Sequence, residues 1–256
     1  MIYLLLSAVS AFFGLTSGLG PTTLLRPLLD AVSPLPPASI AMLCTMATLC
    51  AALVTAFFAL SQPIPVHPDE LILLAVGAVL GGLLGDLASA RFMSMLPRST
   101  AVLMQNALLF TLIALPAIYF NTLSRTLLPI GASRLLSFPV ALGVGMLGSF
   151  LAFGAEPVAL MLYFFLFDAD NNESSAAALT ITLFSMTGKL IALLIRHRML
   201  LPDTGVLLWI LPGALLGALL AMLPGFQRMI SGKVGQILLR LSLFTSLLNM
   251  AAAMAG

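Results

Sequence analysis

The sequence predicts an all-α polytopic membrane protein made of two pseudo-symmetric repeats, each with four apolar segments. Hydrophobic residues make up 61% of the chain and charged residues 8%, whereas a water-soluble domain carries about 25% charged residues. Apolar runs of about 20 residues, long enough to cross a bilayer, recur along the whole chain. The second half also resembles the first at a fixed offset. These observations predict a single transmembrane domain over residues 1–256, with one repeat in 1–125 and the other in 133–256.

The first apolar segment is interrupted near its middle by glycine and proline. Its start lacks the basic region and the cleavage site of a secretory signal, so we expect a membrane helix there. Three continuous segments follow, and the second repeat has the same order, with its own first segment interrupted or re-entrant. The expected bounds are 2–32, 38–61, 70–90 and 101–121 in the first repeat, and 135–167, 174–195, 204–224 and 234–254 in the second.

Two pairs of motifs indicate the duplication. Gly77-Ala-Val-Leu-Gly81 returns as Gly213-Ala-Leu-Leu-Gly217, an offset of 213 − 77 = 136. The same offset aligns Gly18-Leu-Gly20-Pro21 with Gly154-Ala-Glu156-Pro157. Glycines spaced four apart let membrane helices pack closely, so we expect the first pair of motifs to be structural. Interruptions at matching places in two halves instead indicate a transporter with its binding site between the repeats.

Each interruption should end one helix and start another, because glycine has no side chain and proline lacks a backbone donor. The unpaired N–H groups at the start of the second helix favour an anion. A simple kink or close packing is the alternative, since both residue types are common in membrane helices. The expected anion-binding residues are Ser17, Gly18, Gly20, Pro21, Thr22 and Thr23 at the first interruption, and Gly154, Ala155, Glu156 and Pro157 at the second.

Ionisable residues within the spans are further candidates, because burying a charge in the bilayer is costly. Glu156 either exchanges a proton during transport or only caps the helix that follows it. Lys189 is expected either to bind the anion or pair with an acid, or to snorkel to the headgroups. Arg26 has a similar choice between bidentate binding of a sulfonate and anchoring at the interface. Asp86 and Arg91 are expected to form an interfacial pair.

The chain has a helix, a glycine-rich break, a short apolar restart and then helices with small-residue faces, and this order is repeated once. The pattern resembles that of the TauE/SafE sulfite-exporter family over essentially the whole chain. The run Gly18–Leu29 keeps the downstream Pro27 of that family's pattern but has lost part of its glycine run. Glu156 stands where a glycine is usual. The resemblance implies a permease that moves sulfite, sulfonates, sulfoacetate or related small organic anions across the inner membrane of a bacterium.

Other functional classes find less support in the sequence. No nucleotide-binding loop, catalytic triad spacing or histidine-rich metal pattern occurs, so we expect neither an enzyme, nor a metal site, nor a cofactor. The net charge of +2 and the absence of a basic run argue against a nucleic-acid partner. Cys44 and Cys50, six residues apart, predict no disulfide.

The expected function is secondary transport of a small anion by alternating access, with protons as the candidate coupling ion and the lipid bilayer as the solvent. A membrane scaffold that moves no solute and a passive anion channel are the alternatives. If both interrupted segments turn back as hairpins, each repeat crosses three times and the repeats are inverted. If they cross, the repeats run parallel. Loop charges do not decide between the two, and we favour hairpins with both termini cytoplasmic.

Overall fold

The computed structural model describes residues 1–17, 20–59, 66–121, 129–196, 204–223 and 244–245. Within these ranges the chain is helical and has no strand, so the predicted all-α fold is confirmed. The predicted segment 234–254 lies outside the described residues, apart from 244 and 245. The helices are α1 (Ile2–Thr16), α2 (Thr22–Val32), α3 (Pro37–Ala59), α4 (Pro68–Met95), α5 (Arg98–Asn121), the short 3-10 helix η2 (Arg134–Leu136), α6 (Ser137–Leu151), α7 (Glu156–Phe167), α8 (Asn171–Ile195) and α9 (Thr204–Met222).

Six helical stretches of the described chain are long and apolar enough to cross a membrane. They are α3, α4, α8, and most of α5 and α9, together with the joined η2 and α6. Large apolar side chains such as Phe57, Ile72 and Leu208 are exposed on their outer faces. Such surfaces belong in lipid, because monomeric soluble proteins rarely expose large contiguous apolar patches.

Both interrupted segments turn back on themselves. In the first, the Tyr3 hydroxyl near the start of α1 lies 3.3 Å from the Ser33 hydroxyl just after α2. In the second, the N–H of Ile130, ahead of η2, donates to the carbonyl of Phe165 near the end of α7 at 2.9 Å. Each hairpin therefore starts and finishes at the same end of the helix bundle. Its break lies inside the protein.

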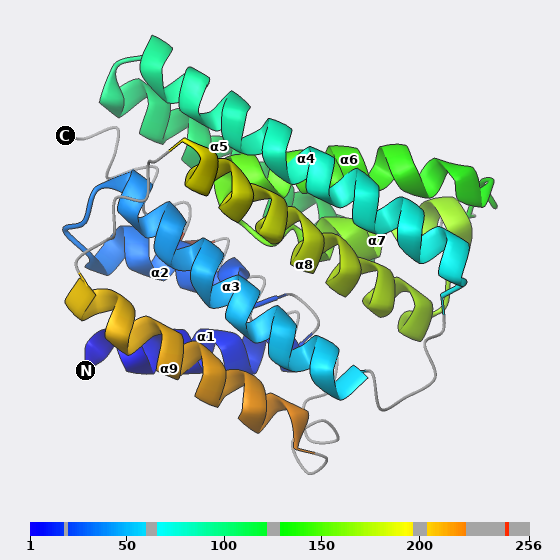
Figure 1. Cartoon of the computed structure of the whole chain (residues 1–256), viewed down its shortest axis with the longest axis horizontal. Helices are drawn as coiled ribbons and strands as arrows, with labels where there is room; N and C mark the ends of the chain where they lie inside the picture. Colours follow the sequence, from blue (N-terminus) through cyan, green and yellow to red (C-terminus); the bar gives the residue numbers. More distant parts are fainter. Residues whose placement is uncertain (18–19, 60–65, 122–128, 197–203, 224–243, 246–256) are drawn as a thin grey trace.

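Each hairpin packs against a helix from the other half of the chain. Helix α1 lies beside α9, and α6 lies beside α4, which also packs against α8 (Figure 1). The predicted glycine faces form both contacts. The glycines at 77 and 81 face backbone atoms of α6 at Phe138 and Leu142, and those at 213 and 217 face backbone atoms of α1 at Leu4 and Ala8. A side chain on any of these glycines would meet the neighbouring helix, so their packing role is confirmed.

Candidate functional site

The first break lies between α1 and α2. Gly20 has a φ of +77°, which glycine adopts without strain, and its N–H donates to the Gly14 carbonyl at 3.0 Å. Pro21 then caps α2. The Ser17 hydroxyl, predicted to face the anion, donates back to Phe13 of α1 at 2.6 Å. Gly18, also predicted as a site residue, lies outside the described residues.

The second break lies between α6 and α7. Ala152 and Ala155 both have positive φ values, 50° and 55°, a conformation that costs an alanine about 1–2 kcal/mol. The N–H of Phe153 donates to the Gly148 carbonyl at 2.8 Å and closes the end of α6. Helix α7 then starts with Glu156 and has proline in its first turn, where the missing donor is no loss. Strained backbone is tolerated only where its surroundings hold it in place.

The two breaks meet in the protein interior. The Gly154 N–H donates to the Thr22 hydroxyl at 2.8 Å, so the second break is bonded to the first turn of α2. The Thr182 hydroxyl of α8 donates to the Gly154 carbonyl at 2.7 Å. Both threonines are fully buried. Sequence reasoning singled out Thr22 but missed Thr182, since nothing in an apolar helix separates one threonine from its neighbours.

Glu156 lies where the two breaks face each other. A Cβ placed on Gly20 would lie 2.2 Å from its Cδ, and one on Gly154 would lie 2.1 Å from its Oε2. Its carboxyl group therefore fills space that both glycines leave open. Glu156 is only 8% exposed, and within the described chain its Oε2 has no hydrogen-bond partner. A buried polar atom without a partner is costly and calls for an explanation.

Two buried cations bind the carboxyl end of α6. Lys189 Nζ donates to the carbonyl of Ser149, and Arg26 Nη1 donates to the carbonyl of Leu151. The last carbonyls of a helix lack partners within it and attract positive charge. Lys189 is 3% exposed, so it does not snorkel to the headgroups. Arg26 also lies 3.5 Å from the Asp30 carboxylate, and it is buried rather than anchored at the interface.

A second polar cluster, which sequence reasoning missed, joins the starts of α4, α6 and α8. The Glu70 carboxylate is 3% exposed and accepts from Arg134 at 2.9 Å, Ser137 at 2.8 Å and Tyr163 at 3.1 Å. Arg134 also pairs with Glu173 at 3.1 Å. These partners lie 64 to 93 residues from Glu70 in the chain, so no local sequence pattern predicts the contacts. The cluster holds the open end of the α6–α7 hairpin against its neighbours.

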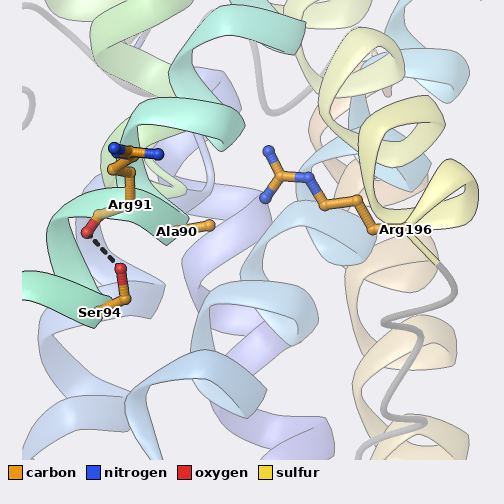
Figure 2. A pocket seen from close by; sticks show the side chains of 4 residues that line it. All are labelled: Ala90, Arg91, Ser94 and Arg196. Atoms are coloured by element: carbon orange, nitrogen blue, oxygen red, sulfur yellow. Dashed lines mark hydrogen bonds between the residues drawn. The ribbon is translucent and has the colours of Figure 1, made fainter.

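Asp86 pairs with Arg196 at 3.4 Å and not with Arg91 as predicted. In Figure 2, Arg196 at the end of α8 reaches toward α4, while Arg91 and Ser94 lie on the other side of a pocket that all three line. The Ser94 hydroxyl is bonded to the Arg91 carbonyl at 2.7 Å. Across the described residues, no three histidine, cysteine or acidic side chains come close enough to hold a metal ion.

The fold and the site define a polytopic helical membrane protein in which two broken helices meet at a buried polar centre. The model of the sulfite exporter TauE/SafE family matches residues 3–254, and the chain belongs to this family. Neither the curated proteins nor the solved structures that were searched gave a match. Membership identifies a multi-pass membrane transporter of the anion-exporter type.

Proposed function

We propose that the protein is a secondary transporter for a small anion of the oxidised-sulfur class, sulfite or a sulfonate, in the inner membrane of a bacterium. The observation that carries this proposal is the meeting of the two breaks, where Gly154 is bonded to Thr22 of α2 and Thr182 of α8. Helices α2 and α7 both begin at this point. Their first-turn N–H groups and positive dipole ends favour a negatively charged solute.

Alternating access requires two halves that move against each other around a fixed site. The helix order supports such halves. Helices α2 and α7 begin 156 − 22 = 134 residues apart, α3 and α8 begin 171 − 37 = 134 apart, and α4 and α9 begin 204 − 68 = 136 apart. The exchange of packing partners, α1 with α9 and α6 with α4, is what a pseudo-two-fold axis would produce. The hairpins open at opposite ends of the bundle (Figure 1), which supports inverted repeats.

The expected substrate-binding residues have different roles in this proposal. Thr22, Thr23 and the backbone around Gly20 and Gly154 border the anion. Pro21, Ala155 and Pro157 shape the two breaks. Lys189 adds positive charge behind the site, where it is bonded to the end of α6. Glu156 exchanges a proton during the cycle and so couples anion flux to the proton gradient.

The direct test is flux of radiolabelled sulfite in proteoliposomes that contain the purified full chain. We expect saturable flux that responds to an imposed pH gradient. Flux that rises linearly with sulfite concentration would indicate a passive channel. No flux of sulfite or of a sulfonate, from protein that is monodisperse and folded, would contradict the proposal and favour the scaffold alternative.

A pair of variants on α8 tests whether the meeting of the breaks is the transport site. Thr182→Val removes the bond to the Gly154 carbonyl, whereas Thr187→Val removes only a bond to Leu183 within α8. A lost hydrogen bond of about 1 kcal/mol corresponds to about a fivefold change in rate. We therefore expect Thr182→Val to lower the flux by roughly fivefold or more and Thr187→Val to leave it nearly unchanged. Equal flux in the two variants would place the site elsewhere.

A further inference from the structure

The space between the two breaks is already occupied by a carboxyl group of the protein itself. A Cβ added to Gly20 would lie within 2.2 to 2.5 Å of the Glu156 carboxyl atoms, and one added to Gly154 within 2.1 to 2.5 Å. These glycines come from different hairpins, 154 − 20 = 134 residues apart. The carboxyl group thus lies between the two backbones that the proposed function assigns to the anion.

Electrostatics makes this position informative. The beginnings of α2 and α7 attract negative charge, and a carboxylate held between them meets the same field as a bound anion. A second anion at that point would be repelled, because charges a few Å apart interact strongly where water is scarce. The Glu156 Oε2 has no hydrogen-bond partner among the described residues, so this oxygen is available to take up a proton.

We propose that the Glu156 carboxylate is a tethered competitor of the substrate, and that the transported anion binds when Glu156 takes up a proton from water and gives up its place. The inference rests on the proposed function and adds the physical link between proton and anion. One proton goes onto a carboxylate oxygen, and the charge between the two breaks is then supplied by the substrate. Release of the anion lets the carboxyl ionise and return.

The other charged groups near the breaks are committed to partners. Arg26 and Lys189 donate to carbonyls at the end of α6, and none of the described cations forms an ion pair with Glu156. Over 2–17 and 137–151 the chain has no charged side chain. Besides Glu156 itself, the charged or titratable side chains on the helices around the breaks are Tyr3 of α1, Arg26 and Asp30 of α2, Cys44 and Cys50 of α3, Asp69, Glu70, Asp86 and Arg91 of α4, Tyr163 of α7, and Glu173 and Lys189 of α8.

The test measures anion binding to the purified full chain between pH 5.5 and 8.5, a range of roughly three units. The first probe is methanesulfonate, which keeps one charge across this range, and the second is sulfite. Competition with one carboxylate makes the apparent affinity fall by up to about tenfold per pH unit as pH rises. Glu156→Gln keeps the shape and removes the charge. We expect this variant to bind with high affinity at every pH. Asp69→Asn, which removes an exposed acid at the start of α4, should keep the wild-type pH dependence.

Proton uptake gives a second measurement that needs no variant. Titration calorimetry of the wild type with methanesulfonate, in buffers of different ionisation enthalpy, should show up to about one proton taken up per anion bound. Anion binding without proton uptake, or a Glu156→Gln variant with the wild-type pH dependence, would overturn the inference and the coupling role of Glu156, and would leave the proposed transport of a small anion standing. Failure of the wild type to bind either probe at any pH would contradict both.

Discussion

Gly82 offers a quantitative test of how α4 and α8 hold the site. A Cβ on Gly82 would lie 2.1 Å from the Ser185 carbonyl oxygen and 2.9 Å from its carbonyl carbon. Carbon and carbonyl oxygen approach to about 3.3 Å, so Gly82→Ala must separate the two helices by roughly 1 Å there. The obstacle is backbone, which cannot rotate away as a side chain would. Overpacking of this kind costs about 1–3 kcal/mol.

The matched control is Gly143→Ala on α6, where an added Cβ meets nothing within 4 Å. That variant should be neutral or stabilising by about 0.5–1 kcal/mol, because alanine is the better helix former. We expect thermal unfolding in detergent to separate the two variants by several degrees, at about 2–4 °C per kcal/mol. Gly82→Ala should also lower sulfite flux, because Thr182 lies one turn from Ser185 on the displaced helix. Equal unfolding temperatures for the two variants would refute the packing argument.

Two further variants probe the polar contacts. Tyr163→Phe keeps the buried ring but removes a donor to the Glu70 carboxylate, so the free energy of unfolding should fall by about 1.5–3 kcal/mol in a denaturant titration; an unchanged value would mean that the bond contributes nothing. Thr22→Val leaves the Gly154 N–H without its hydrogen-bond partner. The variant should lower the free energy of unfolding by about 1–3 kcal/mol and remove most of the flux. Thr55→Val, which removes a bond only to Ala51 in the same helix, is its control, and similar losses in the two would contradict a special role for Thr22.

The sequence was sufficient to predict the features that depend on local composition. Apolar runs identified the spans that the structure describes, because a bilayer requires a fixed length of apolar helix. Glycine and proline identified both breaks, because they change the backbone wherever they occur. The left-handed conformations of Ala152 and Ala155 at the second break were not predicted. Alanine gives no sign of such a conformation, which the surrounding structure imposes.

Features that depend on the packing of distant segments were beyond sequence reasoning. Glu70 and its partners are joined only when the α6–α7 hairpin lies against α4. Asp86 has Arg91 near it in sequence but Arg196 near it in space. A residue's nearest charged neighbour along a helix is a weak guide, because the crossing of two helices brings other side chains closer. The substrate role of the residues at the breaks remains a prediction.

The most direct measurement is an experimental structure of the Glu156→Gln protein with selenite, a heavier analogue of sulfite, located by its anomalous scattering. We predict one strong selenium peak between Gly20 and Gly154, within hydrogen-bond reach of the first turns of α2 and α7. A peak confined to the surface, such as the pocket of Arg91 and Arg196 in Figure 2, or no peak between the breaks at saturating selenite, would contradict the proposed site.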